Sequence, residues 1–168
     1  PRLARSGLSN VQTAAITNER DDRVKRLSHK MDRVLVDAPC SGTGTIRRNP
    51  DLKWRLKEAE LAEITALQSR ILASAAQMVK PGGRLVYATC SLLTQENEAV
   101  ADAFAAAHPD FEALPVAPLL QNVLPNQGET GDELAAKAEK LCAGNCLRLW
   151  PHLHQTDGFF AAVWQRRA

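Results

Sequence analysis

Short apolar runs and one long stretch with helical spacing make up most of the hydrophobic pattern of this 168-residue chain. Two runs, residues 33–37 and 84–89, are rich in β-branched and apolar side chains and are bounded by turn signals, which predicts buried strands. Between them, apolar residues recur at helical spacing from Leu61 to Val79, and Pro81-Gly82-Gly83 ends that pattern. The order strand, helix, strand predicts a crossover unit with two parallel strands.

The rest of the pattern predicts an α/β fold around this unit. Short apolar runs predict four further strands, at residues 11–16, 111–116, 147–150 and 159–165. The stretch 117–146 has little apolar periodicity apart from a short helix at 133–141, so we expect a partly mobile insertion there, with a loop at 121–132.

Two cysteines lie directly after the two central strands. Cys40 belongs to the segment 37–44, Asp-Ala-Pro-Cys-Ser-Gly-Thr-Gly, and Cys90 to the segment 88–91, Ala-Thr-Cys-Ser. Loops at the carboxyl ends of parallel strands line the ligand crevice of such sheets, so both thiols are well placed for chemistry. The alternative is a pair of ordinary buried cysteines that act as small hydrophobes. Pro39 and the nearby glycines favour the first interpretation, because they allow unusual backbone angles and close approach to a ligand.

Charged and aromatic residues near Cys40 are candidates for binding. Asp37 either contacts a ligand at the end of its strand or bonds the backbone amides of its own turn. Basic residues surround Trp54 after the Cys40 loop, which offers phosphate contact and base stacking, or else a solvated helix start. These basic residues are Arg47, Arg48, Lys53 and Arg55. A second basic run is expected to be a solvated face, and it consists of Arg23, Lys25, Arg26 and Lys30.

Composition points to a single globular domain. The chain is long enough to bury a core, and 45% of its residues are apolar. No run reaches the roughly 18 to 20 apolar residues that span a bilayer, and we expect neither membrane insertion nor a secretory signal. A net charge of +2 with a pI near 8.6 says little by itself about nucleic acid. We expect a cytoplasmic protein.

The four cysteines do not predict a disulfide framework, because a chain this large and apolar does not need one. Cys142 and Cys146 form a C-x3-C pair, which His152 and His154 could complete as a zinc site. Structural zinc pairs usually have tighter spacing on both sides, so we expect no metal site.

The order of these motifs resembles the RsmB/Nop2/Sun family of S-adenosylmethionine-dependent RNA cytosine-5 methyltransferases. The matching blocks are residues 32–44, 47–54, 85–91 and 157–161. In particular, the chain resembles the carboxyl-terminal part of the catalytic domain of the bacterial members that act on 16S ribosomal RNA. The resemblance implies a partial Rossmann-like class I methyltransferase sheet, mostly parallel, with residues 147–150 and 159–165 as an antiparallel pair at its edge. It also implies RNA, in particular ribosomal RNA, as the partner.

The resemblance also implies roles for individual residues. Cys90 corresponds to the family's nucleophile, which adds to carbon 6 of a splayed-out cytosine so that carbon 5 can take the methyl group. Cys40 corresponds to the cysteine that assists release of the methylated product. Asp37 corresponds to an acidic residue beside both the cofactor and the base, and Pro39 is placed beside the cofactor. S-adenosyl-L-methionine is the implied cofactor.

The resemblance further implies that the first two strands of the sheet are absent from this chain, together with the glycine-rich cofactor loop. No strand with a glycine-rich turn and helix precedes Cys40. Asn18 or Glu19 lies where a residue near the adenine falls in the family. We expect this chain alone to bind the cofactor weakly and to be inactive.

The absent strands would lie between residues 11–16, the family's third strand, and residues 33–37. Their absence leaves a bare apolar edge, which invites pairing with another chain. We therefore expect either that residues 11–16 move over to pair with residues 33–37, or that the chain dimerises or swaps strands.

Two other functions are compatible with the same residues. A DNA cytosine-5 methyltransferase would use Cys40 as its nucleophile, although the segment Thr89-Cys90 argues against this. A noncatalytic RNA-binding module could have kept the fold without a cofactor site.

Overall fold

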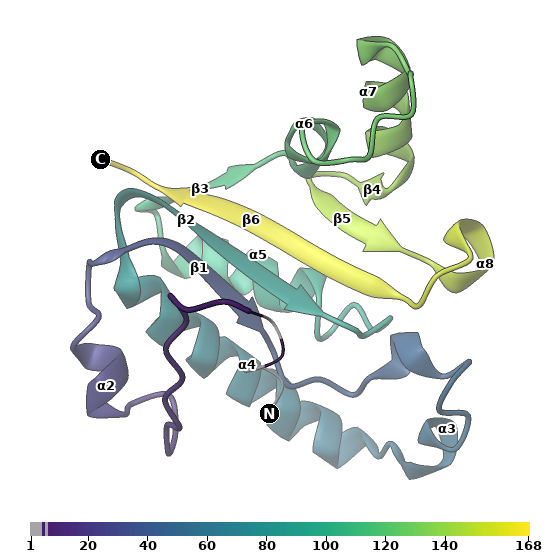
Figure 1. Cartoon of the computed structure of the whole chain (residues 1–168). Coiled ribbons are helices and arrows are strands. Elements are labelled where there is room, and N and C mark those ends of the chain that lie inside the picture. Colours follow the sequence, from purple (N-terminus) through teal and green to yellow (C-terminus); the bar gives the residue numbers. More distant parts are fainter. Residues whose placement is uncertain (1–4, 6) are drawn as a thin grey trace.

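A six-stranded sheet forms the centre of the molecule (Figure 1). The structure is a computed structural model that describes residue 5 and residues 7–168. Within this part the strand order is β1-β2-β6-β5-β4, and β3 also pairs with β6. The strands are β1 (Met31–Asp37), β2 (Val79–Thr89), β3 (Phe111–Leu114), β4 (Cys142–Ala143), β5 (Cys146–Leu149) and β6 (Phe159–Arg166).

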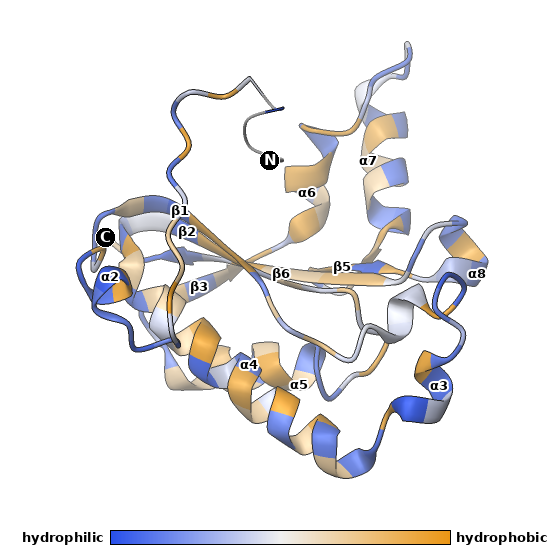
Figure 2. Cartoon of the chain, turned by 60° about the horizontal axis from the view of Figure 1, so that its bottom comes forward, coloured by the Kyte–Doolittle hydropathy of each residue, from blue (hydrophilic) through white to orange (hydrophobic). Residues whose placement is uncertain are grey.

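Helices cover both faces of the sheet. The long helices α4 (Glu58–Met78) and α5 (Glu98–Ala107) share one side, whereas α6 (Val116–Gln121) and α7 (Gly131–Lys140) lie on the other side near β5 (Figure 2). The shorter elements are α2 (Asp22–Lys25), the 3-10 turn η1 (Thr43–Thr45), α3 (Leu52–Arg55) and α8 (Pro151–His154). None of the helices in the described part of the chain has the length and apolar character needed to cross a membrane.

The predicted crossover unit is confirmed. Strands β1 and β2 pair in parallel, and α4 connects them. Burial alternates along β1, with Val34 and Val36 in the core, while β2 places Leu85 and Tyr87 fully inside. Asp37 lies opposite Ala88 in this pairing, so the two chain segments leave the sheet at the same end.

The α/β class is confirmed as a mixed sheet, and its antiparallel part is larger than an edge pair. Strand β6 runs antiparallel to β2, β3 and β5, and it includes the predicted pairing with residues 147–149. Strand β6 also contributes to the core, because the rings of Phe160 and Trp164 are buried there. Phe160 meets Tyr87 edge-on, with ring centroids 6.3 Å apart.

Three segments differ from their predicted structure. Residues 11–16 form no strand and are exposed, because no described strand lies beside them to complete their hydrogen bonds. The strand predicted at 111–116 stops at Leu114, since Pro115 cannot donate to the ladder, and α6 begins at Val116. In the stretch 117–146 the predicted short helix is confirmed as α7, which begins at Gly131, but the pattern did not predict α6, which begins at Val116. The two helices contact each other, and the residues buried on them are Val116, Ala117, Leu134 and Ala138.

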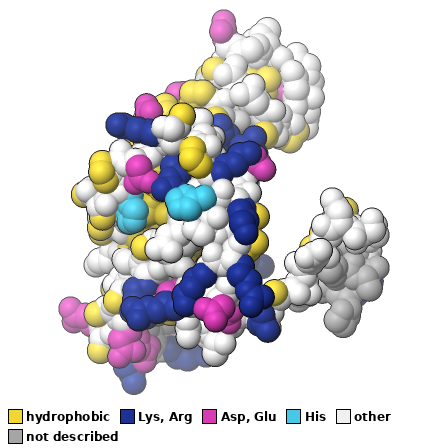
Figure 3. Space-filling view, turned by 90° about the vertical axis from the view of Figure 1, so that its left-hand side faces the viewer, with side chains coloured by type: hydrophobic (Ala, Val, Ile, Leu, Met, Phe, Trp, Pro, Cys, Tyr) yellow, Lys and Arg dark blue, Asp and Glu magenta, His cyan; other side chains and the backbone are white. Residues whose placement is uncertain are grey.

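The second basic run lies around α2, at the end of the sheet opposite the cysteines. All four of its residues are exposed, as predicted for a solvated face. Figure 3 shows Lys and Arg side chains on this side of the molecule mixed with Asp and Glu. The surface therefore lacks the single sign of charge that favours binding of a polyanion.

The outer edge of β1 has no strand beside it in the described part of the chain. Because residues 11–16 stay outside the sheet, the expected rearrangement in which they pair with residues 33–37 is wrong. The side chain of Leu35 on this edge strand is 68% exposed. An apolar edge of this kind is a template for association with another chain.

We expect the chain by itself to self-associate through β1, and we expect Leu35→Lys to reduce that association, because charge on an edge strand opposes strand pairing. Sedimentation velocity over a concentration series measures the effect. Leu153→Lys is the matched control, since Leu153 is 65% exposed but lies on α8. A monomeric wild-type chain at all concentrations would contradict the expectation.

Candidate active site

The thiols of Cys40 and Cys90 lie side by side, with their sulfur atoms 3.4 Å apart. They come together because β1 and β2 are parallel neighbours and each cysteine lies in the loop that leaves the carboxyl end of its strand. Both strands point towards the side of the molecule where α3 and α8 lie (Figure 1). Both thiols are partly exposed, so a ligand can reach them.

The Cys40 thiol is held in its neutral form. Burial, together with its hydrogen bond to Cys90, raises the pKa of Cys40 well above the usual range for a thiol. A neutral Cys40 can donate a hydrogen bond to the neighbouring sulfur at physiological pH.

Backbone contacts hold the two loops together. The Gly44 amide donates to the Cys90 carbonyl (2.9 Å), and the Gly158 amide donates to the Gly44 carbonyl (2.8 Å). This approach leaves no room for a side chain, because a Cβ atom on Gly44 would collide with the Gly158 carbonyl oxygen and would lie 2.7 Å from that of Cys90. Glycine is therefore required in both segments.

Glu96 is a site residue that the sequence pattern did not single out. It lies just before α5, and its side chain is fully buried between the Cys40 and Cys90 loops. Ser41 donates to it through its amide (2.8 Å) and its hydroxyl (2.5 Å), and Ser91 donates through its hydroxyl. In the sequence it is one charged residue just before a helix, where a negative charge is generally favourable, so its residue type indicates no role in the site.

Arg148 is a second residue that the pattern missed, because one arginine within a strand carries no signal. Its side chain is 3% exposed and lies against the rings of Trp150 and Phe160. Its guanidinium donates to the Leu92 carbonyl (2.9 Å), two residues after Cys90, and lies 3.4 Å from the carboxylate of Glu98. Arg148 thus supports the Cys90 loop from the side of β5.

Asp37 and Pro39 lie at the end of β1 and are exposed. Within the described residues, the Asp37 carboxylate has no hydrogen-bond or ion-pair partner, so it is not engaged in the turn or cap role that was the alternative for it. A free carboxylate three residues before Cys40 fits contact with a cationic or hydrogen-bond-donating ligand. These residues can supply one side of a cofactor site.

The basic residues after the Cys40 loop have different partners, and Arg55 forms an ion pair with Asp51. Arg47 and Arg48 both bind the carboxylate of Asp157, and these ion pairs hold the pKa of Asp157 below its usual value. Lys53 instead lies over the ring of Trp54, 5.0 Å from its centroid, and Trp54 is 81% exposed. A phosphate would compete with Asp157 for the two arginines, whereas the Trp54 ring is open to stacking.

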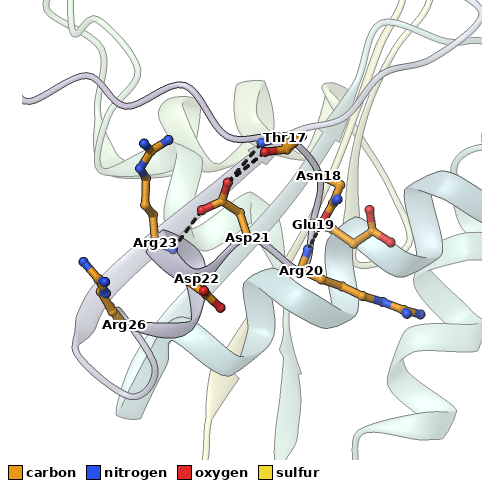
Figure 4. Close-up of a pocket in the computed structure, with 8 residues that line it drawn as sticks. All are labelled: Thr17, Asn18, Glu19, Arg20, Asp21, Asp22, Arg23 and Arg26. Carbon is orange, nitrogen blue, oxygen red and sulfur yellow. Dashed lines mark hydrogen bonds between the residues drawn. The ribbon is translucent and has the colours of Figure 1, made fainter.

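A separate polar hollow is formed by residues 17–26 (Figure 4). Asp21 shapes it by accepting hydrogen bonds from the amides of Thr17 (3.1 Å) and Arg23 (2.9 Å). Asn18 and Glu19 line it, and Glu19 is paired with Arg70 of α4. The hollow is built from one segment and α2, not from the loops that carry the thiols.

Cys142 and Cys146 lie on the short hairpin of β4 and β5. Among the described residues, no group of three or more His, Cys, Asp or Glu side chains is arranged to hold a metal ion.

The mixed sheet with two thiol loops at one edge has the Rossmann-like fold of methyltransferases. A solved methyltransferase homologue protein from Pyrococcus horikoshii superposes with a TM-score of 0.67 and 31% identity, over 98% of this chain and 47% of that chain. Residues 3–165 match the family described as 16S rRNA methyltransferase RsmB/F, and the chain belongs to this family.

Two relatives illustrate how much of the family's length the chain represents. It is 47% identical over 107 residues to ribosomal RNA small subunit methyltransferase B of Klebsiella pneumoniae, covering 61% of this chain. It is 44% identical over 131 residues to the protein of the same name from Sodalis glossinidius, covering 78% of this chain. The chain spans 25% of the length of each relative.

We expect Gly44→Ala to destabilise the chain by about 1–3 kcal/mol, because the new methyl group meets backbone atoms that cannot move independently. Chemical denaturation measures the free energy of unfolding. Gly131→Ala is the matched control, since a Cβ atom there meets no atom within 4 Å, and we expect it to leave the stability unchanged or slightly raised. Equal stability of the Gly44→Ala and wild-type chains would contradict the packing described for this glycine.

Proposed function

We propose that this chain is the carboxyl-terminal part, residues 1–168, of the catalytic domain of a ribosomal RNA cytosine-5 methyltransferase. The observation that supports it is the pair of partly exposed thiols, 3.4 Å apart, at the carboxyl ends of adjacent parallel strands. Membership of a 16S rRNA methyltransferase family supports RNA as the substrate class. A cytoplasmic location follows from this substrate.

Cys90 is the nucleophile in this proposal. Carbon 5 of cytosine is a poor nucleophile until a thiolate adds to carbon 6, which breaks the 5,6 double bond and moves its electron pair to carbon 5. S-adenosyl-L-methionine, when bound, supplies the methyl group that carbon 5 then attacks. Loss of the carbon 5 proton re-forms the double bond and expels the Cys90 sulfur as a thiolate.

Cys40 assists the release of the product. Its thiol is neutral because burial raises its pKa, and its sulfur lies within hydrogen-bonding distance of the Cys90 sulfur. Donation of this hydrogen bond stabilises the thiolate that leaves when the bond to carbon 6 breaks. The same neutral, half-buried state makes Cys40 a poor attacking group, which disfavours the DNA methyltransferase alternative with Cys40 as nucleophile.

Asp37 and Pro39 form the part of the cofactor and base site that this chain supplies. The free, exposed carboxylate of Asp37 can accept a hydrogen bond from the edge of the cytosine and orient it towards Cys90. The glycine-rich loop that usually holds the nucleotide part of the cofactor has no counterpart in this sequence. We therefore propose that the chain alone is inactive and binds the cofactor weakly.

The RNA contacts in this proposal lie on the surface of α3 and on the segment before it. Trp54 supplies a stacking surface, Lys53 adds positive charge beside it, and Arg47 and Arg48 supply phosphate contacts in exchange for Asp157. A noncatalytic RNA-binding module would use the same surface. It would have no need, however, of two adjacent reachable thiols.

We expect Cys90→Ala in the full-length protein to lower methyl transfer by roughly 10⁴-fold or more, because no covalent adduct can form. Cys40→Ala should slow turnover and accumulate the covalent RNA adduct, because the leaving thiolate loses its hydrogen-bond donor. Transfer of labelled methyl groups and denaturing gels measure both effects, with Cys142→Ala as the control. Loss of transfer in Cys40→Ala alone would reverse the roles, and full activity of Cys90→Ala would remove the covalent mechanism.

We expect Trp54→Ala to weaken binding of single-stranded RNA by about 1–3 kcal/mol, the usual contribution of one base stacked on an aromatic ring. Fluorescence anisotropy with a labelled RNA at several salt concentrations measures it. The salt dependence should not change, because no charge is removed. The control is Val123→Ala, which removes apolar surface that is 73% exposed elsewhere. Equal losses in the two variants would contradict a specific stacking role.

A further inference from the structure

The carboxylate of Glu96 is fully buried and is surrounded by neutral hydrogen-bond donors. Gln68 donates to it through its side-chain amide (3.0 Å), and Ser41 and Ser91 donate the other bonds described above. No Lys, Arg or His side chain in the described residues pairs with it. Burial of a carboxylate without a cation is costly, and an apolar side chain could fill the same space at lower cost.

The arrangement of the donors connects the two thiol loops through one atom. Ser41 directly follows Cys40, and Ser91 directly follows Cys90. Both serine hydroxyls donate to the same oxygen, Oε2, of Glu96. The hydroxyl of Thr43 adds a bond to Ser91 (3.1 Å) and accepts the amide of Leu92 (2.8 Å). Any movement of one loop relative to the other therefore stretches a bond to this carboxylate.

Glu96 is itself fixed by two other elements. Tyr87 of β2 donates its buried hydroxyl to the Glu96 carbonyl (2.6 Å). The side-chain amide of Gln68, on α4, bonds both the Glu96 carboxylate and the Pro39 carbonyl. Its distance to the Pro39 carbonyl oxygen is 2.8 Å, and Pro39 directly precedes Cys40. The position of the carboxylate is thus set by the sheet and by the crossover helix, and it does not depend on the loops alone.

We propose that Glu96 is the positioning residue that holds the Cys40 and Cys90 thiols at their reactive separation. This inference rests on the proposed function. Among the described residues, the Glu96 side chain makes no hydrogen bond to either thiol. It therefore acts through Ser41 and Ser91, which directly follow the two cysteines. A misplacement of about 1 Å can cost an enzyme about 100-fold in rate, which makes such a rigid link consequential.

The test compares Glu96→Gln and Glu96→Ala in the full-length protein. Glu96→Gln keeps the shape of the side chain but replaces one acceptor oxygen with an amide nitrogen, so at least one of the four donors must rearrange. Glu96→Ala removes all four bonds. Asp102→Asn is the control, because Asp102 is an exposed carboxylate on α5.

The rate of methyl transfer is measured per active site, with sites counted by trapping on RNA that contains 5-fluorocytosine. We expect the rate constant to fall roughly 10-fold in Glu96→Gln and roughly 100-fold in Glu96→Ala, with KM for RNA changed less than about 3-fold. Asp102→Asn should match the wild type. A residue that contributes only stability would lower the number of active sites and leave the rate per site unchanged, and that result would overturn the inference.

A second readout tests the thiol separation without catalysis. Phenylarsine oxide condenses with two adjacent thiols to form two arsenic–sulfur bonds and one water. The measurement uses a Cys142→Ser, Cys146→Ser background. With the wild-type residue at position 96, the protein should bind one equivalent of phenylarsine oxide that a monothiol cannot displace. Glu96→Ala should bind the arsenical at least roughly 10-fold more weakly, since the two sulfur atoms would no longer be held together. Equal binding would overturn the inference.

The two readouts separate the possible failures. A wild-type protein whose two thiols bind the arsenical, but which forms no adduct with RNA, would contradict the proposed function. The comparison of arsenical binding would then remain as the test of Glu96. A wild-type protein that is active, with Glu96→Gln and Glu96→Ala variants of unchanged rate and bridging, would contradict the role of Glu96 alone. If Glu96→Ala does not fold, both measurements are made on Glu96→Gln.

Discussion

The parallel pairing of β1 with β2 is the constraint on which the site depends. It sets Asp37 opposite Ala88, so the following loops leave the sheet together and their cysteines meet. Parallel strands need a crossover connection, and α4 supplies it while its Gln68 side chain reaches back to the Cys40 loop. The same helix that connects the two parallel strands therefore also supports the candidate site.

The motif at residues 157–160 illustrates how one short segment serves several structural needs. Asp157 binds the two arginines that follow the Cys40 loop, and Gly158 packs its backbone against Gly44. Phe160 anchors the start of β6 in the core beside Tyr87. The segment that leads into the antiparallel strand β6 thus contacts the Cys40 loop and holds it in place, in addition to the contacts from β1 and β2.

Local patterns predicted the parts of this fold that depend on local preference and burial. The strands at 33–37 and 84–89 and the helix between them follow from apolar periodicity and turn residues, whereas the antiparallel pair near the carboxyl end was expected from the family resemblance. The prediction of a strand at 11–16 was wrong because a strand exists only with a partner, and none of the described strands lies beside it. Helix α6 was not predicted, because its apolar residues are buried by contact with α7, a separate segment of the chain.

Residues of the candidate site were predictable where the residue type carries its own chemistry, and unpredictable where their position depends on contacts with distant segments. The two cysteines and Asp37 are recognisable from their positions after strands. Glu96 and Arg148 are ordinary charged residues in sequence, and only the folded chain buries them against Ser41, Ser91 and Leu92. Such supporting residues leave no local signal, because their partners lie on other elements.

Peptide mapping can identify the cysteine that forms the covalent bond to cytosine, which is Cys90 in the proposed mechanism. The full-length protein is incubated with S-adenosyl-L-methionine and RNA that contains 5-fluorocytosine. Fluorine at carbon 5 replaces the proton that must leave before the enzyme is released, so the covalent adduct persists. The product is then digested and analysed by mass spectrometry. We expect the nucleotide to be attached to the peptide that contains Cys90. Attachment to Cys40, or no attachment despite RNA binding, would contradict this expectation.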